Sequence, residues 1–143
     1  MKIVDWNEFT GLLDQLSKEV ALHTFDNIVA IGRGGSIIGA YLASKLGLPA
    51  FVPVFVRHVG RGKEMKIVLN DAGQVKRPKG RLLVVDDWLC EGRAMTFVLD
   101  MLPKSASATT LVMFDRNGSE FTPDFVGAYL DEKERDIMFP YDT

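Results

Sequence analysis

Apolar residues recur near the start of the chain at the spacing of one helical face. The residues concerned are Phe9, Leu12, Leu13, Leu16 and Val20. Steps of three and four residues place such side chains on one side of an α-helix. Asp5 precedes the run and has a side chain suited to an N-cap. The pattern predicts a first helix that begins after Asp5.

A second apolar run, NIVAIG at 27–32, is short and rich in branched side chains, as buried strands are. The four residues 33–36, Arg-Gly-Gly-Ser, follow it and are typical of a tight turn. Apolar residues then return at helical spacing until Gly47 and Pro49, which are helix-ending residues. We therefore expect a buried strand, a glycine turn and a second helix.

The same alternation continues to the C-terminal part. Residues 50–56 indicate a strand in which Pro53 favours an edge position or a bulge. Residues 82–85 indicate a buried strand, followed by helical spacing at 94–102 and a further strand at 109–114. Alternating strands and helices predict an α/β fold with a mainly parallel sheet covered on both faces.

Composition limits the domain number and the location. With 143 residues, 47% of them hydrophobic, the chain can build one core, so we expect a single domain over 1–143. A net charge of −2 argues against bulk nucleic-acid binding, and no apolar stretch is long enough to cross a membrane. One cysteine and no recognisable secretory signal favour a cytoplasmic protein.

Positive charge gathers in the segment 57–80, which glycines and Pro78 interrupt around the short apolar stretch 67–69. This pattern predicts a mobile basic hairpin loop. Its charges either contact an anionic ligand or only keep the loop solvated.

The segment from Asp86 to Arg93 has the strongest chemical signal. It lies between a buried strand and a helix N-terminus, where free backbone amides attract anions and Gly92 permits close approach. Asp86 and Asp87 can accept hydrogen bonds from sugar hydroxyls or hold a hydrated divalent cation. Ligands of parallel sheets bind at such strand ends, so we expect a phosphorylated sugar here.

The motif LLVVDDWLCEGRAMT resembles the acidic pair and phosphate loop of the type I phosphoribosyltransferases. AIGRGGSIIGAYLASKLGLP is similar to their pyrophosphate loop and the helix after it, with Arg33, Gly34 and Gly35 in matching positions. PDFVGAYL and FPYD resemble the C-terminal hood over the base in the small purine-type members, the xanthine, guanine and hypoxanthine enzymes, and we assign this hood to 115–143.

The resemblance implies transfer of ribose 5-phosphate from phosphoribosyl pyrophosphate to a purine-type base, with release of pyrophosphate. It implies Asp86, Asp87 and Arg33 as catalytic residues, with Mg²⁺ bound mainly through the substrate and by the two aspartates. The implied phosphate- and pyrophosphate-binding residues are Arg33, Gly34, Gly35, Glu91, Gly92, Arg93, Ala94, Lys63 and Lys66. The implied base-binding residues are Arg116, Asp136 and Ile137. We also expect a homodimer.

The phosphate loop departs from the family pattern at Cys90, Glu91 and Ala94, where an aspartate and two threonines are usual. These changes remove hydroxyl donors and add a negative charge near the expected phosphate. A second hypothesis is therefore a non-catalytic regulatory protein that binds a nucleotide or phosphoribosyl group. His23 and His58 have no second ligand at metal-binding spacing, so a structural zinc site is not expected.

Overall fold

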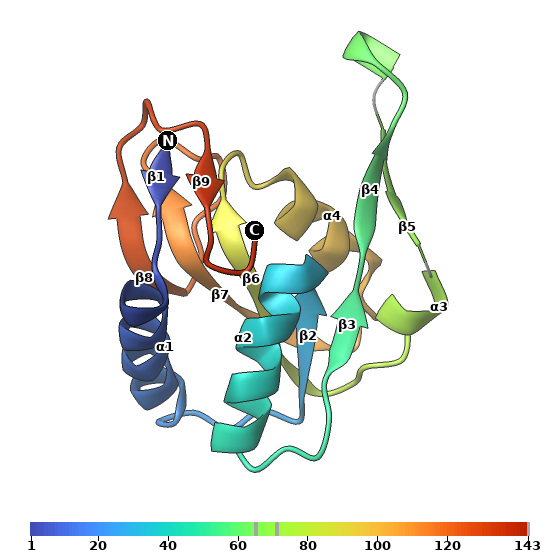
Figure 1. Cartoon of the computed structure of the whole chain (residues 1–143). Coiled ribbons are helices and arrows are strands. Elements are labelled where there is room, and N and C mark those ends of the chain that lie inside the picture. The colour runs from blue at the N-terminus through green and yellow to red at the C-terminus, as the bar shows by residue number, and fades with distance from the viewer. Residues whose placement is uncertain (65, 71, 143) are drawn as a thin grey trace.

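The computed structural model describes residues 1–64, 66–70 and 72–142 and has a five-stranded parallel sheet at its centre (Figure 1). The strand order is β3 (Val52–Val54), β2 (Asn27–Ile31), β6 (Arg81–Leu89), β7 (Ser107–Arg116) and β8 (Phe125–Leu130). All four neighbouring pairs are parallel. The expected α/β fold with a mainly parallel sheet is thus confirmed.

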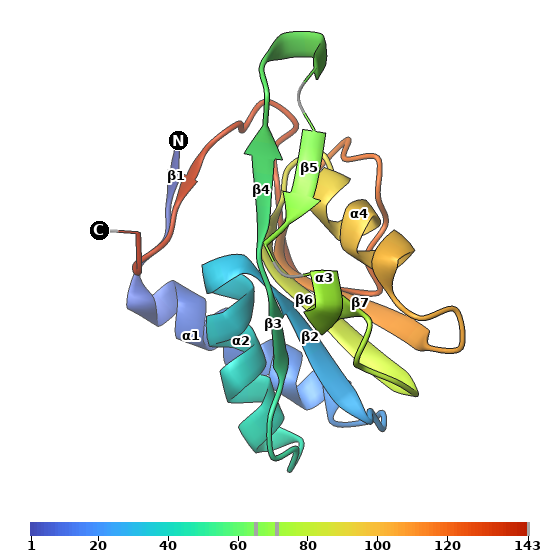
Figure 2. The same ribbon diagram turned by 90° about the vertical axis from the view of Figure 1, so that its right-hand side faces the viewer.

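Helices cover both faces of the sheet (Figures 1 and 2). Helices α1 (Trp6–Val20) and α2 (Gly32–Lys45) pack on one face against Leu83, Val85 and Met113. Helix α4 (Arg93–Met101) packs on the other, against Val84 and Val112. Consecutive strand residues point to opposite faces, which explains why the uninterrupted apolar runs at 28–31 and 82–85 supply both cores.

The first helix begins where the sequence predicts. Asp5 is its N-cap and accepts a hydrogen bond from the Glu8 backbone amide at 2.8 Å. Its buried face contains Phe9, Leu13 and Leu16. The predicted edge position of Pro53 is also confirmed, since β3 is the outermost strand on its side. The segment 50–56 is, however, divided between β3 and the start of another strand, β4 (Val56–Val59).

The predicted glycine turn at 33–36 is wrong. Helix α2 begins at Gly32, so these residues form its first turn. The glycines serve close packing instead of chain reversal. A Cβ at Gly35 would lie 2.8 Å from the Val85 carbonyl oxygen, and one at Gly34 would collide with the Asp87 carboxylate. Small residues let α2 approach β6 where larger side chains would hold it away.

The strand predicted at 82–85 is also longer than expected. β6 continues through the acidic pair to Leu89, because its pairing with β7 extends to Leu89 opposite Asp115. Pairing with β2 on the other side stops at Val85. Asp86 and Asp87 therefore belong to the sheet on one side and are open on the other.

The basic segment forms an antiparallel hairpin that projects from the sheet (Figures 1 and 2). It consists of β4, the short 3₁₀ helix η1 (Gly62–Glu64) and β5 (Lys66–Leu69), followed by α3 (Ala72–Val75). The predicted hairpin is confirmed, whereas its mobility stays a prediction.

The two ends of the chain meet in a small sheet that the sequence did not predict. β1 (Lys2–Ile3) pairs in parallel with β9 (Ile137–Met138). After this pairing, the C-terminal segment 139–142 lies beside the first turn of α2 and reaches Asp87 of β6 (Figure 1). Among the described residues, none of the helices is both long and apolar enough to span a membrane.

Candidate active site

Two adjoining cavities open at the carboxyl end of β6, and Asp86 and Ala94 line both. The larger, about 350 Å³, lies along the segment between β6 and α4 and is called here the loop cavity. The smaller, about 250 Å³, lies between β6, the first turn of α2 and the C-terminal segment, and is called the helix cavity. Asp86 and Asp87 therefore lie between the N-terminus of α2 on one side and the N-terminus of α4 on the other.

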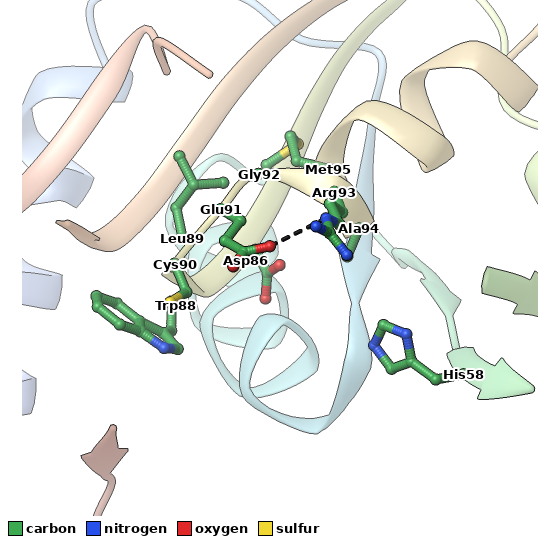
Figure 3. Close-up of a pocket in the computed structure, with 10 residues that line it drawn as sticks. All are labelled: His58, Asp86, Trp88, Leu89, Cys90, Glu91, Gly92, Arg93, Ala94 and Met95. Carbon is green, nitrogen blue, oxygen red and sulfur yellow. Dashed lines mark ion pairs between the residues drawn. The ribbon is translucent and has the colours of Figure 1, made fainter. Parts of the chain in front are cut away.

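The loop cavity is formed mainly by residues 88–95 (Figure 3). Gly92 is the N-cap of α4 and adopts φ 88°, a left-handed conformation that favours glycine. A Cβ there would also collide with Phe121. Glycine at 92 is thus required by the backbone and by its neighbour.

Glu91 and Arg93 form an ion pair beside this N-cap, with 3.0 Å between Glu91 Oε2 and Arg93 Nε (Figure 3). Both side chains are more than half exposed. The negative charge that the sequence places in the phosphate loop is therefore paired locally with Arg93, at the edge of the loop cavity.

His58 lines the loop cavity from β4, across from α4 (Figure 3). In the sequence His58 stands isolated, because nothing in the local pattern shows that the hairpin reaches the cavity. Trp88 lines the same cavity.

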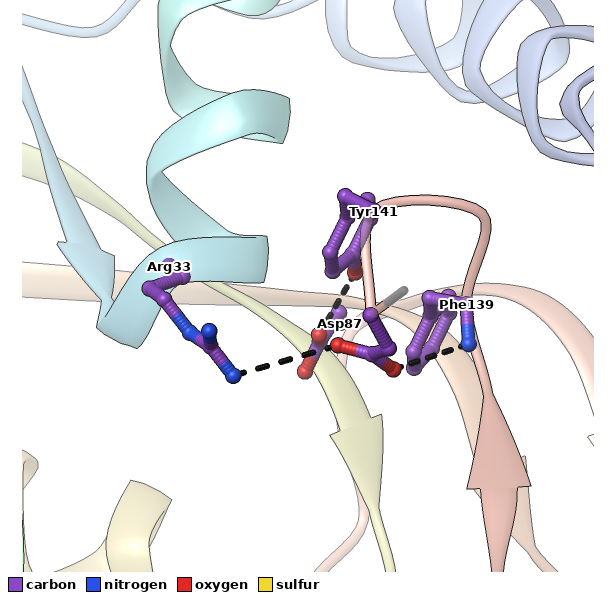
Figure 4. A network of polar contacts seen from close by, with 5 residues as sticks. Arg33, Asp87, Phe139 and Tyr141 are labelled. Atoms are coloured by element: carbon purple, nitrogen blue, oxygen red, sulfur yellow. Dashed lines mark hydrogen bonds and ion pairs between the residues drawn. The ribbon is translucent and has the colours of Figure 1, made fainter.

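The helix cavity joins the acidic pair to Arg33 and Gly34 of α2. The Tyr141 hydroxyl donates a hydrogen bond of 2.6 Å to Asp87 Oδ2 (Figure 4). Asp142 lies 3.9 Å from the Arg33 guanidinium and accepts a hydrogen bond from the Phe139 amide. The C-terminal segment thus contacts Asp87 of β6 and Arg33 of α2, on the two sides of the helix cavity.

Two groups in this site have strongly shifted pKa values. Burial and the neighbouring charge of Asp87 raise the pKa of Asp86 well above its ordinary value. Burial and the Asp87 charge also raise the pKa of the Tyr141 phenol, so Tyr141 stays a hydrogen-bond donor throughout the physiological range. The shift at Asp86 favours its neutral form and so lowers the negative charge at the centre of the site.

Several predicted site residues lie outside these two cavities. Lys63 and Lys66 are exposed on the hairpin, and Asp136 and Ile137 lie at the β1–β9 pair. Gly35 is buried against β6. Their predicted ligand roles stay predictions.

Arg116 is buried at the end of β7, where it is 7% exposed. Its Nε donates to the Cys90 carbonyl and its Nη1 to the Glu132 carbonyl, each at 2.9 Å. It therefore connects the loop before α4 to the C-terminal region. Its predicted contact with a base stays a prediction.

Asp86 and Asp87 bring two carboxylates together in the helix cavity. Among the residues that the structure describes, no group of three or more His, Cys, Asp or Glu side chains is arranged to hold a metal ion. Two adjacent carboxylates suit Mg²⁺, which commonly keeps water ligands and shares substrate oxygens.

Comparison with known proteins agrees with this architecture. No family model matches the chain. The xanthine-guanine phosphoribosyltransferase of Idiomarina loihiensis is 27% identical over 143 residues, covering 97% of this chain and 85% of that protein. The purine phosphoribosyltransferase of Pyrococcus horikoshii has a TM-score of 0.80 at 20% identity, covering 99% of this chain and 93% of that one.

The chain has the fold of the type I phosphoribosyltransferases. A third similar protein, the xanthine-guanine-hypoxanthine phosphoribosyltransferase of Helicobacter pylori, has a TM-score of 0.77 at 19% identity over 99% of this chain and 92% of its own. The sequence resemblance to small purine phosphoribosyltransferases thus extends to the whole fold. The strand end that carries Asp86 and Asp87 is the candidate active site of this phosphoribosyltransferase fold.

Proposed function

We propose that this protein transfers ribose 5-phosphate from phosphoribosyl pyrophosphate to a purine-type base and releases pyrophosphate. The observation that carries the proposal is the position of Asp86 and Asp87 between the first turns of α2 and α4. A sugar that carries two anionic groups needs two anion-binding regions, and between them hydrogen-bond acceptors for its hydroxyl groups. Similarity to purine phosphoribosyltransferases supports the choice of reaction.

In this proposal the sugar hydroxyls bind the two aspartates and its 5-phosphate lies at residues 90–94. The pyrophosphate lies at the first turn of α2, where Arg33 supplies positive charge as negative charge develops on the leaving group.

Mg²⁺ is part of the proposal, with Asp86 and Asp87 as the protein groups that hold it. When bound, the ion neutralises charge on the leaving pyrophosphate. The surrounding residues orient the sugar, and Lys63 or Lys66 adds charge if the hairpin closes over the cavities and excludes water. Arg116, Asp136 and Ile137 are the proposed contacts of the base.

The test is pyrophosphate release from phosphoribosyl pyrophosphate with Mg²⁺ and each of a panel of purine and pyrimidine bases. Release that depends on one purine would support the proposal and identify the acceptor. D87N should lower the rate at least a hundredfold, because a neutral amide replaces the carboxylate at the sugar. D100N is the matched control, since Asp100 is exposed on α4 and lines neither cavity.

Calorimetry with the same compounds distinguishes the proposed transferase from the alternative, a non-catalytic regulatory protein. A regulatory protein would bind a nucleotide or phosphoribosyl compound without releasing pyrophosphate for any base. Release with D87N at the wild-type rate would contradict the proposed site.

A further inference from the structure

The Tyr141 side chain is held in one position by aromatic packing. Its ring stacks on Phe139 at 5.2 Å between centroids, with only 5° between the planes. Phe9 packs edge-on against it at 5.5 Å, and Trp6 lies 6.4 Å away. Residues from α1 and from the C-terminal segment thus fix the direction of the hydroxyl group.

The backbone that carries Tyr141 is also fixed. The β1–β9 pair fixes the start of the segment, and the Asp142 amide donates to the Phe139 carbonyl at 3.0 Å. The Asp142 carboxylate accepts from the Phe139 amide at 2.9 Å, which closes a tight turn around Tyr141. A rigid turn therefore presents one phenol to the acidic pair.

The hydroxyl meets Asp87 at a crowded point. The Tyr141 hydroxyl bonds to one oxygen of the carboxylate, Asp87 Oδ2 (Figure 4). This oxygen lies against Gly34, where a Cβ would collide with Asp87 and with the Tyr141 hydroxyl. Asp87 is thereby confined between α2 and the C-terminal segment. A carboxylate confined through one oxygen offers the other in a defined direction.

We propose that Tyr141 is a positioning residue, which holds the Asp87 carboxylate in the orientation that recognises a sugar hydroxyl. The inference rests on the proposed function for the role of Asp87. It adds that the C-terminal segment helps to discriminate ribose from deoxyribose.

The test compares calorimetric affinities for GMP and its 2′-deoxy and 3′-deoxy analogues in wild type and Y141F. The variant keeps the ring and its packing but lacks the hydroxyl. We expect the preference for GMP over at least one deoxy analogue to fall about three- to tenfold, with affinity for that analogue nearly unchanged. Y129F is the matched control, because Tyr129 is 63% exposed on β8 and lines neither cavity.

Other outcomes overturn the inference. Equal weakening of all three ligands would mean that Tyr141 only supports the fold. Tighter binding of GMP by Y141F would mean that the phenol competes with the sugar hydroxyl. Failure of wild type to bind any of the three would overturn both the inference and sugar recognition by Asp87, whereas binding without pyrophosphate release would overturn only the proposed reaction.

Discussion

Glu91 and Arg93 form an ion pair on either side of Gly92, the N-cap of helix α4. The same helix N-terminus is the expected position of the ligand's 5-phosphate. If the 5-phosphate binds there as proposed, it would meet the repulsion of Glu91 and compete with it for Arg93. We therefore expect the pair to weaken phosphate binding at this loop.

We expect E91Q to raise affinity for GMP about three- to tenfold and to leave affinity for guanosine unchanged, because the released Arg93 is available only to a phosphate. The gain should shrink as salt is added. Calorimetry with both ligands at two ionic strengths measures it. E19Q, on α1, controls for net charge, and an equal gain for guanosine would contradict the explanation.

Arg116 provides a second test of how the site is assembled. We expect R116M to lower the free energy of unfolding by about 2–4 kcal/mol, because the buried side chain loses two charge-assisted hydrogen bonds to part-buried carbonyls. Urea denaturation measures the change. R135M, at an exposed position, should change stability by less than about 0.5 kcal/mol. A similarly small effect of R116M would show that the two hydrogen bonds contribute little to folding.

The sheet and its flanking helices were predictable because their signals are local. Leu83 and Val85 belong to one core and Leu82 and Val84 to the other, so an unbroken apolar run already indicates a strand buried on both faces. The position of the acidic pair directly after that run was predictable for the same reason. So was the helix that begins after Asp5.

Contacts between distant segments were not predictable in this way. The hydrogen bond between Tyr141 and Asp87 joins residues 54 positions apart, and its geometry depends on the β1–β9 pair. The sequence predicts Gly34 and Gly35 as turn residues, since it does not distinguish a glycine that bends the chain from one that allows two elements to approach. His58 reaches the loop cavity only because of how the hairpin is placed.

The raised pKa of Asp86 predicts that this residue reduces stability at neutral pH. The folded state favours the protonated carboxyl, so the stabilising contribution is present below the unfolded pKa of about 3.9 and is lost as pH rises above it. We therefore expect D86N to be more stable than wild type at pH 7, with an advantage that disappears near pH 3.5. Urea denaturation at the two pH values tests this. D100N should show no such pH-dependent gain, and a D86N protein less stable than wild type at pH 7 would contradict the prediction.

Tyr141 should show the corresponding effect at alkaline pH. Burial and the Asp87 charge raise the pKa of its phenol in the folded state, so folding retains a proton that the unfolded chain loses above about pH 10. The stability advantage of wild type over Y141F is then present below pH 10 and falls above it by up to about 1.4 kcal/mol per pH unit. Urea denaturation between pH 8 and pH 11 measures this difference, with Y129F as the control at an exposed tyrosine. A difference between wild type and Y141F that stayed constant to pH 11 would mean that the phenol ionises as easily in the folded protein as in the unfolded chain, and that its bond to Asp87 does not hold the proton.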